Sequence, residues 1–400
     1  MSEFLRVPYG CTVHGEDEIA AVTHVLRTTT QMGKHVNEME VGVAKKFDKK
    51  YGVMVNSGSS ANYLAIEVAH LPPQSEVITP VLTFSTTVAP LVKNNLIPAF
   101  VDVAPGTYNI DADQVEAMIT PKTKAMMIPN LLGNLPDWKK LRAIADQHKL
   151  LVIEDSADTL GALIDGKSSG RFTDISTTSF YGSHVINCGG NGGMVCFNKE
   201  SDLTEAKLLR SWGRSSSLFV ESEAIENRFN VFVEGIRYDA KFIFERLGYN
   251  IEPSEMGAAF GTVQFRKLDL NIDLREKWFK KHLAFYKDYE QFFILPKQLP
   301  NSRTGWLAFA MTVRPDAPFS RTDMQIFLEK RNIQTRTIFT GNILRQPGFQ
   351  TIARRQNDAG YPHADEVMRG GILQACHHGL TEEMMSHMHE SAQLFLKKYV

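Results

Sequence analysis

Residues 179–194 read Ser179-Phe-Tyr-Gly-Ser-His184-Val-Ile-Asn-Cys-Gly189-Gly-Asn-Gly-Gly193-Met194. A β-rich run enters this stretch, and the glycines that follow predict a turn whose backbone can approach another group closely. The stretch carries one hydroxyl at Ser179 and one imidazole at His184, whose ordinary pKa lies near neutrality. A lone histidine here is either a structural residue or a group that moves protons in a binding site.

Outward from this turn, short β-rich runs alternate with helical stretches between residues 51 and 197. Several runs are apolar without a period of two, as expected for strands buried on both faces. The pattern predicts an α/β fold with a mixed, mostly parallel seven-stranded sheet, with ligands gathering where the strands end. The seven runs are Val53–Val55, Glu76–Thr79, Ile97–Val101, Ala125–Ile128, Leu150–Glu154, Ile175–Phe180 and Met194–Phe197.

The length of 400 residues predicts two lobes. We expect a large domain over residues 1–265, including an N-terminal arm, and a small C-terminal α/β domain over residues 266–400, entered through a long connecting helix. The small domain should contain strands at Trp306–Val313 and near Ile333–Ile338, a helix that begins at the Ser320 capping box, and a final helix after Thr381.

Composition excludes some classes of protein. The 44 Lys and Arg residues balance 45 Asp and Glu residues, so no strong basic field for nucleic acid is expected. The N-terminus lacks the apolar core of a signal peptide, and no segment reaches the roughly 20 apolar residues of a membrane span. We therefore expect a cytoplasmic protein with a small-molecule partner. The four cysteines lack metal-site spacing and are expected to be buried free thiols, with no metal bound.

Three further groups of residues follow predicted strands. The Ser57-Gly58-Ser59-Ser60 turn enters a helix, so it is either a phosphate site at the positive end of the helix dipole or an ordinary N-cap. Phe84 is either a core residue or a ring that stacks on a flat cofactor. Asp155 either caps a helix or holds a protonated pyridine nitrogen, which would make the ring an electron sink.

In order and spacing, these motifs resemble the DegT/DnrJ/EryC1/StrS sugar aminotransferase family of fold-type I pyridoxal phosphate (PLP) enzymes, which have the aspartate aminotransferase-like fold. The resemblance runs from Gly33 to the last helix. Its motifs are Ser57–Ala61, Pro80–Phe84, Phe100–Asp102, Glu154-Asp155, Ser179-Phe180, Gly192-Gly193 and Leu247–Asn250.

The family pattern implies a role for each matching position. The Ser57–Ser60 turn, including Gly58 and Ser59, and Ser179 would bind the cofactor phosphate. Phe84 would stack on the cofactor ring, and Asp155 would pair with its nitrogen. Asn250 would reach the cofactor phosphate of a neighbouring subunit, which implies a homodimer with a shared active site.

His184 stands where the family carries the lysine that binds the cofactor covalently, and no lysine lies between Lys167 and Lys199. This replacement resembles the sugar 3-dehydratases, which hold pyridoxamine phosphate (PMP) without a covalent bond and remove a C3 hydroxyl from a nucleotide-linked 4-keto-6-deoxyhexose. His184 would be the catalytic base, and glutamate would regenerate PMP. Asp158 agrees with this subgroup, because aminotransferases commonly carry Gln or His there.

The dehydratase resemblance extends to residues 335–347, which look like a substrate loop with Arg336, Asn342 and Arg345 as substrate-binding residues. Arg336 suits a carboxylate or phosphate; the alternative is an ordinary surface arginine. One branch of these enzymes carries an iron–sulfur cluster on cysteines after a Trp-Gly-Arg segment. The corresponding segment, Trp212–Glu221, has no cysteine, so we expect no cluster and no external electron donor.

The cluster-free branch implies GDP-4-keto-6-deoxymannose as the substrate, on the route to the dideoxysugar colitose of lipopolysaccharide O-antigen. CDP, dTDP and UDP sugars remain open. Two rival interpretations also remain: an aminotransferase in which a different lysine binds PLP, and a non-catalytic relative that binds B6 or a nucleotide sugar.

Overall fold

A seven-stranded sheet forms the centre of the computed structural model, which describes residues 4–219 and 224–400. The strand order is β1-β9-β8-β5-β4-β2-β3. Every one of the seven runs predicted from the sequence is one of these strands. Their bounds are β1 Tyr51–Val55, β2 Glu76–Pro80, β3 Ile97–Val101, β4 Thr123–Pro129, β5 Leu151–Ser156, β8 Ile175–Ser179 and β9 Gly193–Phe197.

Strand β9 pairs antiparallel with both of its neighbours, β1 and β8, whereas β8, β5, β4, β2 and β3 are mutually parallel. Strands β8 and β9 are consecutive in the chain and pair antiparallel in the sheet. The glycine-rich stretch that connects them therefore lies beside the end of β8. Antiparallel strands need only a short connection of this kind. The connection therefore places His184 at the carboxyl end of the parallel strands, as predicted.

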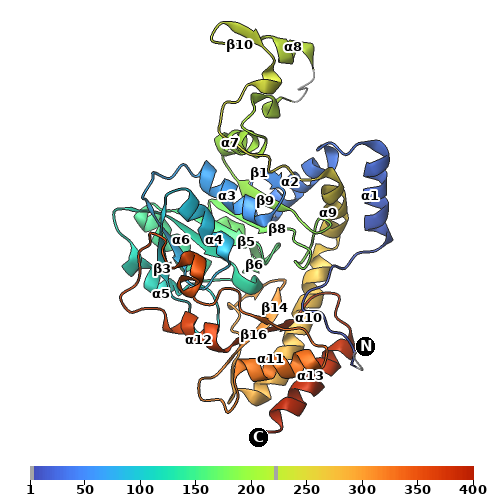
Figure 1. The fold of residues 1–400 in the computed structure, drawn as a ribbon, viewed down its shortest axis with the longest axis vertical. Helices are drawn as coiled ribbons and strands as arrows, with labels where there is room; N and C mark the ends of the chain where they lie inside the picture. Colours follow the sequence, from blue (N-terminus) through green and yellow to red (C-terminus); the bar gives the residue numbers. More distant parts are fainter. Residues whose placement is uncertain (1–3, 220–223) are drawn as a thin grey trace.

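Helices cover both faces of this sheet (Figure 1). Apolar side chains of α3 and α7 pack on one face, and those of α6 on the other. Helices α2 and α9 pack near the β1–β9 edge. The bounds are α1 Glu16–Thr28, α2 Lys34–Lys46, α3 Gly58–Val68, α4 Ser85–Lys93, α6 Trp138–His148, α7 Glu200–Arg210 and α9 Glu255–Arg266.

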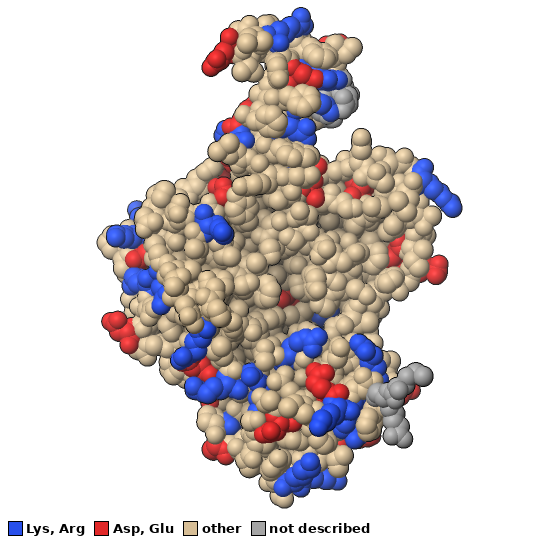
Figure 2. Space-filling view, in the orientation of Figure 1, with Lys and Arg blue, Asp and Glu red and all other residues tan. Residues whose placement is uncertain are grey.

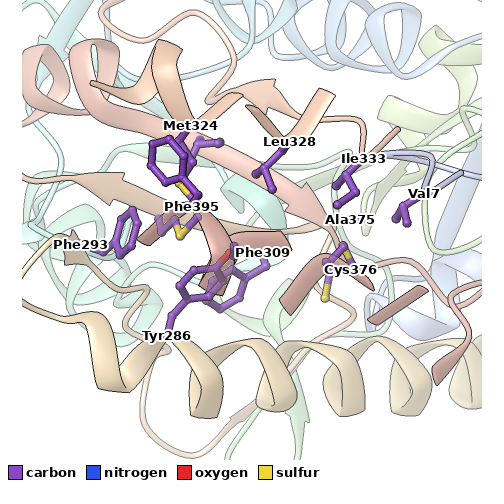
Figure 3. Packing of buried hydrophobic residues seen from close by; sticks show 14 of the residues in the cluster. Val7, Tyr286, Phe293, Phe309, Met324, Leu328, Ile333, Ala375, Cys376 and Phe395 are labelled. Carbon is purple, nitrogen blue, oxygen red and sulfur yellow. The ribbon is translucent and has the colours of Figure 1, made fainter. Parts of the chain in front are cut away.

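A second, four-stranded sheet of order β12-β14-β16-β15 lies below the first in Figure 1, beside the long helix α10. Its core is aromatic: Tyr286 of α10, Phe309 of β14 and Phe395 of α13 belong to one buried cluster (Figure 3). The bounds are α10 Leu268–Tyr286, β12 Phe293–Ile294, β14 Ala308–Val313, α11 Arg321–Lys330, β15 Arg336–Thr337, α12 Pro362–Gly370, β16 Gly371–Ala375 and α13 Glu382–Leu396.

The predicted helix starts in this unit are confirmed. Ser320 caps α11 and forms a capping box with Asp323, and Thr381 caps α13. The strand predicted near Ile333–Ile338 is shorter than expected, because Ile333 forms a bridge to Val7 of the N-terminal arm instead of joining the sheet. The predicted domain boundary between residues 265 and 266 falls at the end of α9, just before α10 begins at Leu268, and stays a prediction.

A segment containing helix α8 (Ile225–Phe229) and the hairpin of β10 (Val231–Val233) and β11 (Ile236–Tyr238) projects away from the body at the top of Figures 1 and 2. Elsewhere on the face in Figure 2, acidic and basic side chains are interspersed. Val220 and Glu221, at the end of the cysteine-free segment after Arg214, lie outside the described residues.

Three of the four cysteines, Cys188, Cys196 and Cys376, are buried free thiols as predicted, whereas Cys11 is only half-buried. Among the described residues no helix is both long and apolar enough to cross a membrane. In the same ranges, no group of three or more His, Cys, Asp or Glu side chains is arranged to hold a metal ion.

Candidate active site

A cavity of about 510 Å³ opens at the carboxyl ends of the central strands. Three parts of the chain line it: the large sheet and its loops, Tyr9 of the N-terminal arm, and Leu307 and Phe339 of the second unit. Seven of the predicted site residues line it together: Gly58, Ser59, Phe84, Asp155, Asp158, Ser179 and His184. None of the described residues that line the cavity is a lysine.

The Ser57–Ser60 turn begins α3 and faces the cavity. Ser57 is the N-cap of this helix and accepts a hydrogen bond from the Ser60 N–H at 3.1 Å; this cap is compatible with a phosphate at the same turn. Gly58 lies so close to β8 that an added Cβ would be 2.5 Å from the Ser179 Cβ. This close approach brings the first turn of α3 beside the Ser179 hydroxyl. The first N–H groups of a helix and neighbouring hydroxyls form a donor set suited to phosphate.

Asp155 lies at the end of β5 and is almost completely buried. Its Oδ2 accepts hydrogen bonds from Asn62 Nδ2 at 2.7 Å and Thr87 Oγ1 at 2.8 Å, and its Oδ1 accepts one from the Ala157 N–H at 3.1 Å. Burial raises the pKa of Asp155, while these three donors favour its ionised form. Among the described residues no cationic side chain pairs with this carboxylate, although it lines the cavity.

Phe84 precedes α4 and keeps 51% of its surface exposed, so it is not a core residue. Its ring meets Phe339 edge-on, with centroids 5.7 Å apart at 78°. Phe339 adopts a positive φ of 40°, which is uncommon for an aromatic residue and turns the loop toward the cavity. The two rings therefore form an apolar wall against which a flat ligand can lie.

The hydrogen bonds of His184 fix its tautomer. Its Nδ1 lies 3.2 Å from the Ser179 carbonyl oxygen, which only accepts hydrogen bonds, so Nδ1 carries the proton. The Nε2 atom then carries a lone pair, and it lies 4.0 Å from Asp158 Oδ1. Such an imidazole can accept a proton at Nε2.

Burial sets the charge states of this pair. It lowers the pKa of His184 to about 4, with the nearby Arg275 cation acting in the same direction. It raises the pKa of Asp158 to about 7, although the Leu132 N–H donates to that carboxylate at 2.8 Å. At neutral pH, His184 is therefore a neutral base beside a carboxyl group that is easily protonated, and the two do not form a full ion pair.

Together these groups fit a phosphorylated pyridine cofactor. The α3 terminus and Ser179 provide donors for a phosphate, Phe84 a flat surface, and Asp155 a buried carboxylate that lacks a cation. A protonated pyridine nitrogen would supply that cation.

The three predicted substrate-binding residues, Arg336, Asn342 and Arg345, lie outside the lining of the cavity. Arg345 forms a two-pronged ion pair with Asp365, with its Nε 2.6 Å from Oδ1, and Asn342 Nδ2 donates to the same Oδ1 at 2.9 Å. Neither residue lines the cavity. Arg336 is exposed, and its guanidinium lies 5.5 Å from the ring centroid of Tyr9, which does line the cavity. Substrate binding by these three residues stays a prediction.

Asn250 is exposed and does not line the cavity of its own chain. Its side-chain oxygen accepts a hydrogen bond from the Glu252 N–H at 3.1 Å, and its backbone forms a bridge with Ser211. Its predicted role toward a neighbouring subunit stays a prediction.

Several residues of the site were not predicted from the sequence. Asn62 and Thr87 donate hydrogen bonds to Asp155. Both lie in predicted helices, and nothing in the local sequence pattern indicated that they reach this carboxylate. Tyr9 lies far from the other motifs in sequence, and Arg275 lies in a charged helix that reads as solvent-exposed. Only the folded chain brings Asn62, Thr87 and Tyr9 to the cavity, and Arg275 to the backbone of the turn that carries His184.

Comparison with known proteins agrees with this geometry. The model of the DegT/DnrJ/EryC1/StrS aminotransferase family matches residues 13–393. A dTDP-4-dehydro-2,6-dideoxy-D-glucose 3-dehydratase of Saccharopolyspora spinosa is 33% identical, over 98% of this chain and 86% of that protein. A GDP-4-keto-6-deoxy-D-mannose 3-dehydratase of Yersinia pseudotuberculosis is 30% identical, over 89% of this chain and 92% of the relative.

Among solved structures, a GDP-4-keto-6-deoxymannose-3-dehydratase with a trapped PLP-glutamate geminal diamine superposes with a TM-score of 0.86 at 26% identity, covering 97% of this chain and 100% of the other. The fold is thus that of the PLP-dependent aminotransferases and these dehydratases. The seven-stranded sheet, the cavity at its strand ends and the match along nearly the whole chain lead to one conclusion: this chain belongs to the DegT/DnrJ/EryC1/StrS aminotransferase family.

Proposed function

We propose that this protein is a PMP-dependent 3-dehydratase that removes the C3 hydroxyl of a nucleotide-linked 4-keto-6-deoxyhexose. The observation that carries the proposal is His184, a neutral imidazole that faces a cavity whose described lining contains no lysine. Without an amine, the protein has no group there to hold the cofactor covalently. It keeps a group that moves protons.

When bound, the cofactor supplies the amine that condenses with the C4 ketone and a ring system that accepts an electron pair. Asp155 keeps the ring nitrogen protonated, and Asn62 and Thr87 hold Asp155 in place. The turn before α3 and Ser179 bind the phosphate. His184 takes up a proton at Nε2 and returns it to the C3 oxygen, which makes that oxygen a better leaving group.

Glutamate closes the cycle. Loss of the C3 hydroxyl is a two-electron reduction of that carbon. The amine form of a bound cofactor would supply these two electrons, with its amino nitrogen leaving as ammonia, and glutamate would restore the amine form and leave as 2-oxoglutarate. This assignment is supported by the related dehydratase solved as a PLP–glutamate adduct. No external reductase or iron–sulfur cluster is needed for this balance.

GDP-4-keto-6-deoxymannose is the substrate we favour, because similar proteins with that activity occur among both the sequence relatives and the solved structures. The dTDP sugar of the Saccharopolyspora relative is the main alternative. Arg336, exposed beside Tyr9 at the cavity, is the residue we expect to bind the substrate's diphosphate or the glutamate carboxylate. The product would serve the synthesis of a dideoxysugar such as colitose in the cytoplasm.

We further propose that the working unit is a homodimer with a shared active site. The projecting segment and the residues that follow it expose large apolar side chains that a lone chain would leave in water, including Phe232 at 64% and Ile236 at 66% in the hairpin and Leu247 at 97% after it. Exposed large apolar side chains that gather on one segment are typical of an interaction site. Asn250 follows this segment and is itself exposed, in keeping with contact to a second copy.

The test is to incubate the purified protein with PMP, glutamate and a panel of GDP-, dTDP-, CDP- and UDP-linked 4-keto-6-deoxysugars. Mass spectrometry of the sugar and the consumption of glutamate are the measurements. We expect one panel member to lose its C3 oxygen, with one glutamate consumed and one ammonia released per sugar. A 4-amino sugar that keeps its C3 oxygen, or turnover that requires a reductase and no glutamate, would refute the proposal.

A further inference from the structure

Arg275 is a completely buried cation in the middle of α10. No carboxylate within the described ranges forms a salt bridge with it. Buried cations without a counter-ion are costly, so they persist where other groups satisfy every part of the side chain and the charge has a use.

The guanidinium of Arg275 joins three segments that are distant in sequence. Its Nη2 donates to the carbonyl oxygens of Ser183 at 3.0 Å and His184 at 2.9 Å. Its Nη1 donates to the carbonyl oxygen of Trp306 at 2.9 Å, and a longer contact of 3.4 Å reaches Leu307. Its Nε donates to His378 Nδ1 at 3.2 Å.

We propose that Arg275 is a positioning residue for His184: its guanidinium ties the 183–184 turn to the start of β14 and to the segment after β16, and so sets the orientation of the imidazole in the cavity. This inference adds a residue to the proposed function and rests on it for the catalytic role of His184.

The geometry requires an arginine. A planar guanidinium carries five N–H donors in a fixed fork, and here that fork meets carbonyls on two sides and an imidazole on the third. A lysine ammonium would keep the charge but could not hold these directions at once. Because Leu307 lines the cavity, the same fork also links the base to the wall contributed by the second unit.

His378 must be neutral for this arrangement. A guanidinium nitrogen only donates, so Nδ1 of His378 accepts, and burial together with the Arg275 charge lowers the pKa of His378 to about 3. The positive charge therefore stays on Arg275 throughout the neutral range.

The charge has a second effect on His184. The groups that face the imidazole are Asp158, with Oδ1 at 4.0 Å, the Tyr181 ring, at 5.9 Å between centroids, and Tyr9 across the cavity. Burial is the main cause of the low pKa of His184, and the Arg275 cation contributes in the same direction. Removing the cation should therefore raise the pKa of His184, whereas replacing it with lysine should not.

The experiment compares Arg275→Met, Arg275→Lys and a matched control, Arg210→Met. Arg210 is also buried and donates to a backbone carbonyl, that of Met54 at 3.1 Å, but it pairs with Glu40 at 2.6 Å and lies away from the 183–184 turn. The first readout is the titration of His184 in cofactor-free protein, followed by NMR of ¹³C-labelled histidine and assigned with His184→Asn. It requires no substrate.

For Arg275→Met we expect the His184 pKa to rise by about one pH unit, and kcat per bound cofactor to fall at least about tenfold. For Arg275→Lys the pKa should stay near the wild-type value while kcat falls by a similar factor, because the charge remains and the fork is lost. Arg210→Met should lower Tm but leave both the His184 titration and kcat per folded protein unchanged.

The inference is overturned if a folded Arg275→Met protein keeps both the wild-type His184 titration and its kcat. Should that variant not fold, Arg275→Lys decides: full kcat there would refute the positioning role. A shifted titration in a protein that dehydrates no sugar would refute the proposed reaction and leave the Arg275 inference standing.

Discussion

Replacing His184 with asparagine removes the Nε2 lone pair while keeping a side chain that can donate to the Ser179 carbonyl. In the wild type the His184 pKa of about 4 leaves the imidazole almost entirely neutral at pH 7.5, so the base is available in nearly every molecule. Its removal should therefore lower the rate by the whole contribution of the base. Losing a positioned general base costs on the order of 10²–10⁴ in rate, which is about 3–5 kcal/mol of transition-state stabilisation.

The assay is single-turnover loss of the sugar's C3 oxygen by PMP-loaded protein, followed by mass spectrometry. Cofactor occupancy is measured from absorbance, so that the rate is compared per bound cofactor. We expect the variant to bind the cofactor as the wild type does, because Asp155 and the α3 turn are unchanged. The exposed His24 provides the matched control, and His24→Asn should react at the wild-type rate. Protonation of His184 itself should lower the wild-type rate only as the pH approaches 4, well below the range near pH 7 in which Asp158 titrates. If His184→Asn at full occupancy keeps more than about a tenth of the wild-type rate, His184 is not the base.

Three other predictions follow from the same site. Borohydride reduction of the resting holoenzyme should attach no pyridoxyl group to any lysine, and denaturation alone should release all the cofactor; a pyridoxyl-lysine peptide in the digest would contradict noncovalent binding. Mixing inactive Asn250→Ala and His184→Asn proteins should restore about a quarter of wild-type activity after random subunit exchange, since half the dimers then hold one intact site; no recovery after proven exchange would argue against a shared site. Gly58→Ala should weaken cofactor binding at least about tenfold and lower the unfolding free energy by roughly 1–3 kcal/mol, because the new Cβ would lie 2.5 Å from the Ser179 Cβ. The control is Gly348→Ala, whose new Cβ would have nothing within 4 Å. Equal cofactor affinity in the two variants would refute the close-approach argument.

Strand positions followed from the sequence because strands buried on both faces leave short apolar runs, and all seven runs became strands of one sheet. Strand β15 was overestimated, since Ile333 pairs with the N-terminal arm, a contact that no local pattern encodes. In the predicted substrate loop, too, a contact between distant segments was not predictable from the local sequence. Arg345 was predicted to bind substrate from the resemblance, but its guanidinium is engaged by Asp365, twenty positions further along the chain.

The sequence alone was sufficient for the fold class, the family, and the presence at the cavity of Asp155, Ser179 and His184. Each of these residues lies at or just after the end of a buried strand, and strand ends converge at one edge of a parallel sheet. The charge states of these groups were decided by tertiary structure. Burial, which depends on packing from Tyr9 to Phe339, lowers the pKa of His184 and raises that of Asp158. The buried position of Arg275 could likewise not be predicted from its charged helix. Its five N–H donors meet their acceptors only when the two units of the chain pack together.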